Sequence, residues 1–516
     1  MATPLSSTAS AGTGAIVTEA IPDLAGSVEV SPLGYARSRT LLIRAVPNPC
    51  YEFDHWEGNV SGTANPVTFR TSRKHSRVKA RAVFRQTCDP STDASGEGNL
   101  RIVGYFPEWG IYRQPPYLVK NVVASGSAEK LAVLNYAFAI PKPDSKGVVT
   151  CQLDDPWSAF QRPYSAQESV DGIADDPRQP LRGHFNQLRK LKRMYPHLKI
   201  VVSIGGWLGS TYFSDAASTD ATRSAFVTSC IDTYVRGNLP QQSNAGGHAV
   251  AAGIFDGFDL DWEFPVSGGH EGIRHSIDDA TNFGLLVAEF RRQFKAIGRE
   301  DLLLTAAVPA GEQYADNYRL SDNHPYLDYV LLMSYDFYGD WSGTTGHHTN
   351  LCPSPGDPGY PEWSLSVDQT VKLYRDRYRV PAEKILVGAA FYARGWTGVE
   401  SAQNGLYQRK GGGAPGTYEN GYELYRDLEQ NMSNGYIPYW DDRARAAWLY
   451  DGATRTFWTF DEPRSLAFKA RYVTYHKLGG MMFWEMSGDT DDGVLLSSIH
   501  EGLQSDPPAT DPCSGM

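Results

Sequence analysis

The sequence lacks the features that would place it in a membrane or on nucleic acid. No apolar run approaches the roughly 18 residues that a membrane-spanning helix needs, so no membrane span is predicted. The formal net charge is −11 and Lys and Arg form no block, which argues against a nucleic-acid partner because phosphate binding depends on clustered cations. The opening stretch MATPLSSTASAGTGAIVTEAIPDL has no basic segment followed by an apolar core, so no secretory signal is expected in it.

Cysteine is scarce, and no two cysteines form a CxxC pair, so a zinc ribbon is not expected. Neither GxGxxG nor GxxxxGK[ST] opens a helix, which removes the usual nucleotide-binding signals. We therefore expect no cofactor. One or two disulfides are compatible with export, but the sequence leaves their pairing open among Cys50, Cys88, Cys151, Cys230, Cys352 and Cys513.

Changes in composition divide the chain. Residues 1–25 are rich in Ala, Ser, Thr and Gly and are predicted to form a flexible tail. Residues 26–85 alternate short apolar runs with turn residues, which predicts a small all-β module. Residues 86–99 are typical of a linker, and residues 503–516 are expected to form a C-terminal tail.

From residue 100 onward, strand-like and helix-like segments alternate. Helical periodicity is clear at 182–195, 279–297 and 464–477. Eight strands with helices between them predict an α/β fold, a TIM (β/α)₈ barrel, with a doubly wound open sheet as the alternative. The eight apolar runs are 101–106, 130–139, 199–205, 256–264, 302–309, 329–337, 385–393 and 479–486.

The connection between the seventh and eighth runs is too long for one loop and one helix. Residues 395–462 contain alternating segments and Gly-rich turns, which predict an inserted α+β domain. The barrel would then cover residues 100–394 and be completed by residues 463–502.

The fourth run ends in Asp256-Gly-Phe-Asp-Leu-Asp-Trp-Glu263. Side chains alternate along a strand, so Asp259, Asp261 and Glu263 share one face while Trp262 points to the other. Three neighbouring carboxylates raise the pKa of at least one of them through charge repulsion and loss of solvent. An acid that stays protonated near neutral pH is what glycosidic bond cleavage needs.

A metal site is the alternative use of three carboxylates. Ca²⁺ and Mg²⁺ sites draw oxygen ligands from flexible loops, whereas this segment is a strand in an apolar context, so no metal is expected. Barrel enzymes carry their active sites at the C-terminal ends of the strands. Polar and aromatic residues gather at those ends here: Glu263, Tyr335, Asp336, Tyr392, Arg394, Trp484 and Glu485.

Together with Ser203-Ile-Gly-Gly-Trp207, Met333-Ser-Tyr-Asp336 and the run from Gly388 to Trp396, this carboxylate strand resembles the chitinases of glycoside hydrolase family 18. The resemblance covers roughly residues 100–500 and is strongest to bacterial multidomain chitinases with an α+β insertion. The N-terminal module resembles a divergent β-repeat of bacterial surface and secreted proteins, in which a Cys50–Cys88 staple is one option.

The resemblance implies a role for each carboxylate. Glu263 would be the general acid and later the general base, and Asp261 would orient the substrate's N-acetyl group. Asp259 would lie deeper and share a proton with Asp261, and Tyr335 would hydrogen-bond the acetamido oxygen. This family is an exception to the two-carboxylate scheme, because the substrate's own acetamido oxygen attacks the anomeric carbon and the configuration is retained.

The resemblance also implies a sugar-binding surface, because pyranose rings pack on aromatic side chains. Trp484 would form its floor, and Trp109, Trp207 and Trp341 would stack on neighbouring units. The remaining expected substrate contacts are Asp336, Met333, Tyr392, Arg394, Glu419 and Tyr105.

The predicted function is retaining hydrolysis of the β-1,4-N-acetylglucosamine linkages of chitin or chito-oligosaccharides by an extracellular monomer. One alternative is an endo-β-N-acetylglucosaminidase acting on glycoprotein cores, and the Trp series and the insertion favour chitin over it. The other is a catalytically silent chitin-binding lectin, but such proteins usually lack the terminal Glu of the motif, which Glu263 supplies here.

Overall fold

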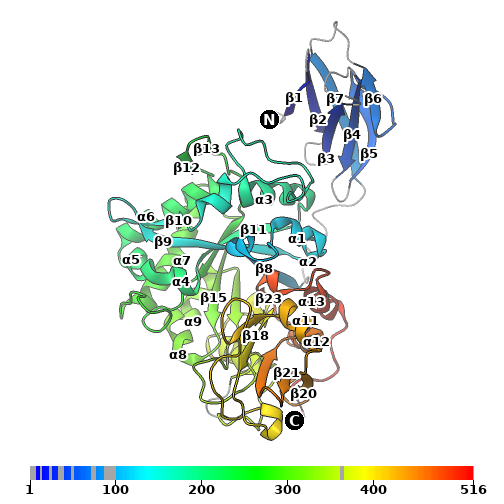
Figure 1. Cartoon of the computed structure of the whole chain (residues 1–516). Helices are drawn as coiled ribbons and strands as arrows, with labels where there is room; N and C mark the ends of the chain where they lie inside the picture. The colour runs from blue at the N-terminus through cyan, green and yellow to red at the C-terminus, as the bar shows by residue number, and fades with distance from the viewer. Residues whose placement is uncertain are drawn as a thin grey trace. The chain divides into compact units, whose positions relative to one another are not determined.

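The structure is a computed structural model that describes residues 7–11, 14–21, 26–32, 40–47, 51–70, 77–86, 100–360 and 365–514. The chain divides into two compact units. The first holds residues 1–99, and the second holds most of residues 100–516 (Figure 1).

The first unit is all-β, as predicted. One sheet has the strand order β1-β2-β7-β5 and the other the order β3-β4-β6. The buried core between them includes Leu41, Ile43, Trp56 and Phe84. The strands are β1 Ser7–Ala11, β2 Gly14–Ile21, β3 Gly26–Pro32, β4 Thr40–Pro47, β5 Tyr51–Gly58, β6 Val67–Arg70 and β7 Arg77–Gln86.

The predicted tail over residues 1–25 differs from the structure, which has β1 and β2 there. β2 pairs in parallel with β7, and β1 pairs with β2. Glu19 on β2 lies 2.9 Å from Lys79 and 2.8 Å from Arg81 on β7, so charge pairs add to the main-chain hydrogen bonds. Most of the predicted linker, together with Cys50 and Cys88, lies outside the described residues.

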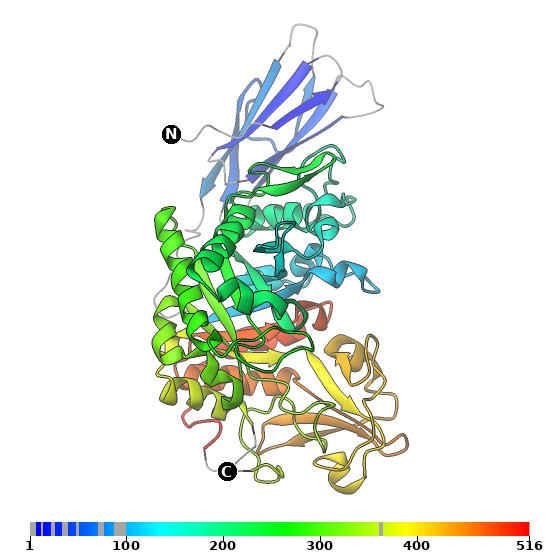
Figure 2. The same cartoon turned by 90° about the vertical axis from the view of Figure 1, so that its left-hand side faces the viewer.

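The second unit contains a closed barrel of eight parallel strands, and Figure 2 shows these strands from the side among the surrounding helices. β8 pairs with both β9 and β23, which closes the barrel, so the TIM prediction is confirmed and the open-sheet alternative is wrong. β10 Val149–Leu153 adds an antiparallel hairpin to β9. The barrel strands are β8 Arg101–Pro107, β9 Val133–Pro143, β11 Lys199–Gly205, β14 Gly257–Asp261, β15 Leu303–Pro309, β16 Tyr329–Met333, β17 Ile385–Ala390 and β23 Gly480–Trp484.

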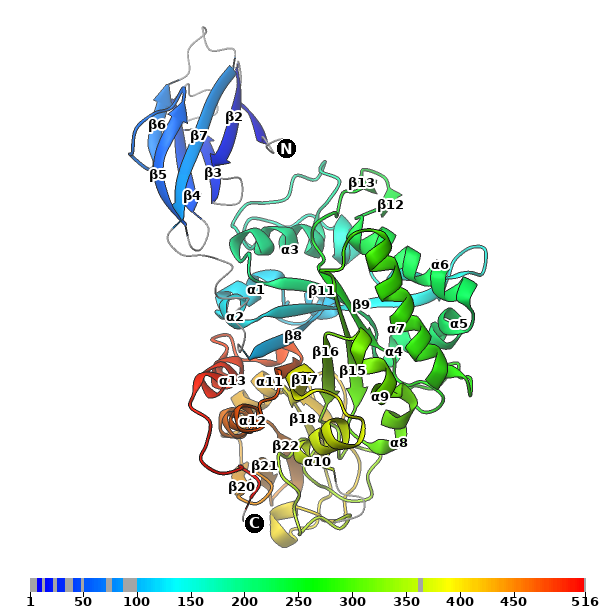
Figure 3. The same cartoon turned by 180° about the vertical axis from the view of Figure 1, so that it is seen from behind.

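Helices cover the outside of the barrel (Figure 3). The three helical segments predicted from periodicity are α3, α7 and α12. Phe290 of α7 packs 5.3 Å from Phe258, whose side chain points away from the barrel interior. The helices are α1 Val119–Ala124, α2 Ser127–Lys130, α3 Gly183–Met194, α4 Gly206–Gly209, α5 Phe213–Ala217, α6 Asp220–Cys230, α7 Asp279–Ala296, α8 Glu312–Ala315, α9 Leu320–Asn323, α10 Val367–Lys372, α12 Pro463–Tyr475 and α13 Val494–Gln504.

The α+β insertion after β17 is a five-stranded antiparallel sheet of order β19-β18-β22-β21-β20 with α11 Tyr425–Asn431. Its first strand begins at Tyr392, so the predicted boundary at residue 395 cuts through a strand. The strands are β18 Tyr392–Trp396, β19 Tyr422–Leu424, β20 Ile437–Asp441, β21 Ala446–Asp451 and β22 Thr456–Phe460.

A buried ion pair marks the point where the insertion returns to the barrel. Asp461, directly after β22, lies 2.6 Å from the Lys469 amine of α12, and both side chains are almost fully buried. The same carboxylate accepts the N–H of Ala390 at the end of β17 at 3.1 Å. The end of the insertion is thus fixed to the strand from which the insertion departs.

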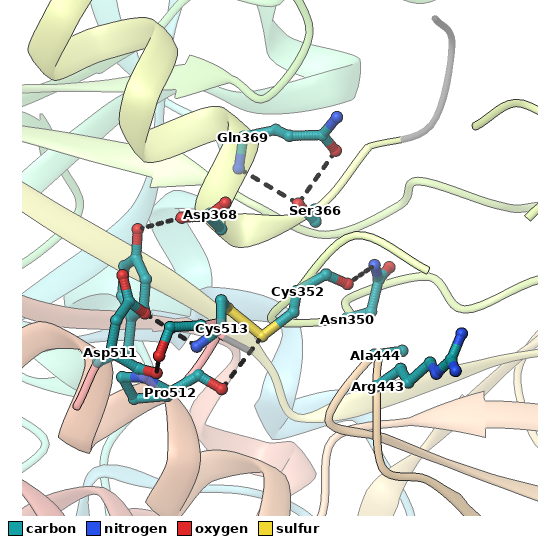
Figure 4. The surroundings of a disulfide bond; sticks show 12 residues. Asn350, Cys352, Ser366, Asp368, Gln369, Arg443, Ala444, Asp511, Pro512 and Cys513 are labelled. Atoms are coloured by element: carbon teal, nitrogen blue, oxygen red, sulfur yellow. Dashed lines mark hydrogen bonds between the residues drawn. A yellow bond between two sulfur atoms is a disulfide. The ribbon is translucent and has the colours of Figure 1, made fainter. Parts of the chain in front are cut away.

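The predicted C-terminal tail is not free. α13 continues to Gln504, and Cys513 forms a disulfide with Cys352, 161 residues away (Figure 4). His476 on α12 also lies 3.0 Å from Asp511. The disulfide and this side-chain contact therefore hold residues 511–513 to the rest of the second unit.

Candidate active site

The three carboxylates of the fourth run lie at the C-terminal end of β14. Asp259 and Asp261 are buried inside the strand, and Glu263 follows its end and is half-buried. Trp262 points the other way and stacks on Phe213 at 5.2 Å, as the alternation predicts.

Asp259 is the most deeply held of the three. Tyr105 Oη and Ser203 Oγ each donate to its Oδ2 at 2.8 Å, and Thr305 Oγ1 donates to its Oδ1 at 2.6 Å. Burial raises the pKa of Asp259, and the three hydrogen bonds oppose that rise. Tyr105, expected as a substrate contact, is buried, and its hydroxyl donates to this carboxylate.

Asp261 lies between the other two carboxylates. Burial, followed by the charges of Glu263 and Asp259, raises its pKa well above the ordinary value. Within the part of the chain that the structure describes, its buried Oδ1 has no hydrogen-bond partner. A buried polar atom of this kind calls for a partner such as water or a bound ligand. Proton sharing between Asp259 and Asp261 stays a prediction.

The Glu263 carboxyl group has a raised pKa. Burial of its carboxyl group, followed by the negative charge of Asp336, raises its pKa to about 8. Its main-chain N–H donates to Ser210 Oγ at 2.9 Å. At neutral pH the side chain therefore carries a proton that it can give away.

Tyr335 lies above the end of β16, close to the carboxylates. Burial raises its pKa first, and the charges of Asp261 and Glu263 raise it further, so its hydroxyl remains a proton-bearing donor. Its ring contacts Tyr392 at 6.0 Å. Met333 and Trp484 pack with Tyr335 against the apolar residues that fill the barrel.

Asp336 is bound from two sides. Arg394 donates from Nε and Nη2 to its two carboxylate oxygens, each at 2.8 Å, and Tyr392 Oη donates to Oδ1 at 2.8 Å. Burial alone would raise the pKa of Asp336, but Arg394 and the nearby His348 outweigh burial and lower it. Asp336 therefore stays ionised beside Glu263.

Aromatic rings continue the site outward. Trp484 stacks on Phe138 at 5.7 Å and lies 6.0 Å from Trp109, which is 37% exposed. Trp207 and Trp341 are 52% and 64% exposed, and Arg394 lies over the Trp341 ring at 5.3 Å. The structure thus brings Trp109 together with Trp484, and Trp341 together with Arg394.

Some site residues were not predicted. Thr305 comes from β15 and Phe138 from β9, and the register of Thr305 opposite Asp259 is visible only once β14 and β15 are paired. Tyr422 of the insertion stacks on Tyr392 at 4.9 Å and lies under Arg394 at 5.5 Å.

Glu419 of the insertion is the remaining residue expected to contact sugar. It is exposed and its backbone forms a bridge with Tyr422, but none of the described hydrogen bonds or ion pairs brings its side chain to the carboxylates. Its expected role as a sugar contact stays a prediction.

The described residues contain no cluster of three or more His, Cys, Asp or Glu side chains arranged to hold a metal ion. The buried ring of His347 packs instead against Tyr407 and Trp448. In the same described ranges, every helix is too short or too polar to cross a membrane.

Fold and site together define a (β/α)₈-barrel protein with an acidic cluster where barrels carry their active sites. A family model described as glycosyl hydrolases family 18 matches residues 101–489. The chain belongs to this family.

Relatives and solved structures agree with this assignment. The chain is 35% identical over 435 residues to chitinase A1 of Niallia circulans, covering 78% of this chain and 58% of that protein. It is 37% identical over 463 residues to chitinase 63 of Streptomyces plicatus, covering 86% and 69%. The catalytic domain of psychrophilic chitinase B from Arthrobacter TAD20 superposes with a TM-score of 0.74 at 36% identity, covering 80% of this chain and 97% of that chain.

Proposed function

We propose that the protein is a chitinase that hydrolyses β-1,4 bonds between N-acetylglucosamine units with retention of configuration. The observation that carries this proposal is the pairing of Glu263, whose pKa is raised to about 8, with Asp261, whose buried oxygen has no hydrogen-bond partner in the described structure. Membership of family 18 supports the same chemistry.

In the first step, Glu263 gives its proton to the glycosidic oxygen as the bond to the anomeric carbon breaks. The substrate's acetamido oxygen attacks that carbon and forms an oxazolinium ion. Asp261 accepts a hydrogen bond from the acetamido N–H and stabilises the positive charge that develops. The Tyr335 hydroxyl donates a hydrogen bond to the acetamido oxygen and orients it.

In the second step, Glu263 acts as the base. It takes a proton from water, the water oxygen attacks the anomeric carbon, and the acetamido oxygen leaves. Two attacks on opposite faces restore the starting configuration, and no second protein nucleophile is needed. Asp336 stays ionised, and together with Arg394 and Tyr392 it forms the polar side of the same subsite.

Trp484, Trp109, Trp207 and Trp341 would bind successive sugar units by stacking. Trp109, Trp207 and Trp341 are exposed, which suits a ligand with several sugar units, so chitin and chito-oligosaccharides are the proposed ligands. The proposal includes that the protein acts as a monomer outside the cell. The Cys352–Cys513 disulfide supports an oxidising location. Gel filtration with light scattering tests the monomeric state.

The decisive experiment compares Glu263→Gln with Glu501→Gln, a matched change at an exposed position of α13. Turnover of a chromogenic chitobioside should fall by about 10²–10⁴-fold in Glu263→Gln and remain normal in Glu501→Gln. Wild-type turnover in Glu263→Gln would overturn the proposal. So would products that first appear as the inverted anomer in proton NMR.

Two further comparisons address the alternatives. A lectin would bind chito-oligomers while the unaltered protein showed no turnover. An endo-β-N-acetylglucosaminidase would release high-mannose glycans from a glycoprotein faster than it degrades colloidal chitin, and we expect the reverse order.

A further inference from the structure

Ser210 lies directly beneath the proposed acid, on the segment that follows β11. Its side chain is fully buried, and its Oγ accepts the main-chain N–H of Glu263 at 2.9 Å. The same Oγ lies 3.0 Å from the carbonyl oxygen of Asp261 and 2.9 Å from that of Gly206. A hydroxyl has one proton and two lone pairs, so Ser210 can accept from Glu263 while it donates to one of these carbonyls.

The contact matters because Glu263 lies beyond the regular strand. The ladder between β11 and β14 ends at the Gly205–Asp261 pair, and the ladder between β14 and β15 ends at Leu260 and Ala306. The Glu263 N–H donates to a side chain from the neighbouring loop and not to a neighbouring strand.

The loop reaches this position because β11 ends in a glycine, Gly205. A Cβ on Gly205 would lie 2.3 Å from the Asp261 carbonyl oxygen, and Gly205 has a positive φ of 107°. Only glycine permits so close an approach with this backbone conformation. The approach places Ser210 within reach of both Asp261 and Glu263.

Trp262 is held by contacts of its own, separate from the Ser210 contact to Glu263. The Trp262 ring stacks on Phe213, and its carbonyl oxygen accepts a hydrogen bond from the Tyr318 hydroxyl. Trp207, an exposed ring proposed to stack on sugar, belongs to α4, the short helix that ends just before Ser210.

We infer that Ser210 is a positioning residue for the proton donor: its hydroxyl fixes the Asp261–Glu263 segment and so keeps the Glu263 carboxyl group inside the barrel mouth. This inference rests on the proposed function. Ser210 does not touch the reacting atoms and acts only through the backbone of the acid.

Removal of the hydroxyl leaves the Glu263 N–H without its partner and frees the segment to relax toward solvent. Burial is the largest cause of the raised pKa of Glu263, so greater exposure lowers that pKa toward the ordinary value of 4.5. A larger fraction of Glu263 is then ionised at neutral pH and cannot donate a proton. The Glu263 side chains that remain protonated are also less well positioned.

The test compares Ser210→Ala with Ser158→Ala. Ser158 is also fully buried and donates one hydrogen bond to a main-chain oxygen, that of Asp155, at 3.2 Å. We expect Ser210→Ala to lower kcat about 10- to 100-fold with KM nearly unchanged, because small displacements of a reacting group are costly. The alkaline limb of its kcat/KM profile should move from near pH 8 to lower pH, whereas Ser158→Ala should keep the wild-type limb.

Each outcome has a separate meaning. If Ser210→Ala loses only thermal stability and keeps the wild-type kcat and alkaline limb, this inference is wrong while the role of Glu263 stands. If Glu263→Gln retains full turnover, the proposed function itself fails. Should Ser210→Ala not fold, Ser210→Thr and Ser210→Cys replace it. Ser210→Thr keeps a hydroxyl and should keep the alkaline pKa of the wild-type kcat/KM profile. Ser210→Cys has a thiol, which accepts hydrogen bonds weakly, and should lower that pKa. The same alkaline pKa in both variants would refute the inference.

Discussion

Arg394 and Asp336 are joined by two parallel hydrogen bonds of 2.8 Å, and this pair holds a negative charge beside the proposed acid. The charge of Asp336 is the second cause, after burial, of the raised pKa of Glu263. Arg394 keeps Asp336 ionised, so an arginine of the insertion's first strand supports the proton affinity of a glutamate after β14.

The first prediction concerns pH. Above pH 8 Glu263 loses the proton it must donate, so kcat/KM on a chitotriose substrate should fall with an apparent pKa near 8. Asp336→Asn removes the nearby negative charge and should move this limb to lower pH. An unchanged limb in that variant would show that Asp336 does not influence the acid.

The same pKa affects stability. The unfolded chain releases the Glu263 proton near pH 4.5 and the folded chain retains it to about pH 8. The contribution of Glu263 to stability is therefore complete below pH 4.5 and is lost as the pH rises through 8. In urea titrations, the free energy of unfolding of Glu263→Gln should decline less than that of the wild type across this interval.

The second prediction concerns Arg394. Arg394→Lys keeps a positive charge but loses the paired geometry with Asp336, and Arg394→Met loses both. We expect Arg394→Met to lower the free energy of unfolding by about 2 kcal/mol, with a smaller loss for Arg394→Lys. Denaturant titration measures both, and equal losses in the two variants would contradict a role for the charge.

The third prediction concerns Thr305. Thr305→Val removes the 2.6 Å hydrogen bond to Asp259 and should cost about 1.5–3 kcal/mol of stability, because the acceptor is a carboxylate. Thr370→Val is the matched control, since Thr370 is equally buried and donates to a neutral carbonyl at 2.9 Å. Thr305→Val should reduce kcat and Thr370→Val should not. A comparable reduction of kcat in Thr370→Val would refute a specific role of the Thr305–Asp259 hydrogen bond in the active site.

The fourth prediction concerns the disulfide. Cys513→Ser opens the link to Cys352 and should lower the free energy of unfolding by about 2–4 kcal/mol with kcat retained. The Cys352→Ser/Cys513→Ser double variant should match the single variant, because both lack the same bond. Calorimetry of the oxidised wild type beside the variants provides the measurement, and an unchanged melting temperature in Cys513→Ser would contradict it.

The barrel was predictable because its strands are short apolar runs spaced by helices, and each of the eight runs contains most of a barrel strand. The shared face of Asp259 and Asp261, opposite to that of Trp262, followed from side-chain alternation alone. These features are local, and a single sequence carries local patterns well.

Features that depend on residues far apart in the chain were not predicted from the sequence. The composition of residues 1–25 predicts a flexible tail, and β2 becomes a strand only through its pairing with β7. The Cys352–Cys513 pair spans 161 residues, a separation that no local spacing predicts. Thr305 and Ser210 gain their roles from the positions of neighbouring strands and loops around β14, which emerge only after the barrel closes.

The ion pair of Asp461 and Lys469 has a mechanical consequence. The insertion leaves the barrel just after Ala390 and comes back at Asp461, and the hydrogen bond from Ala390 to Asp461 fastens those two crossing points to each other. Because both contacts are buried, the two ends of the insertion are tied to each other and to the outer helix α12, and the base of the insertion moves with the barrel.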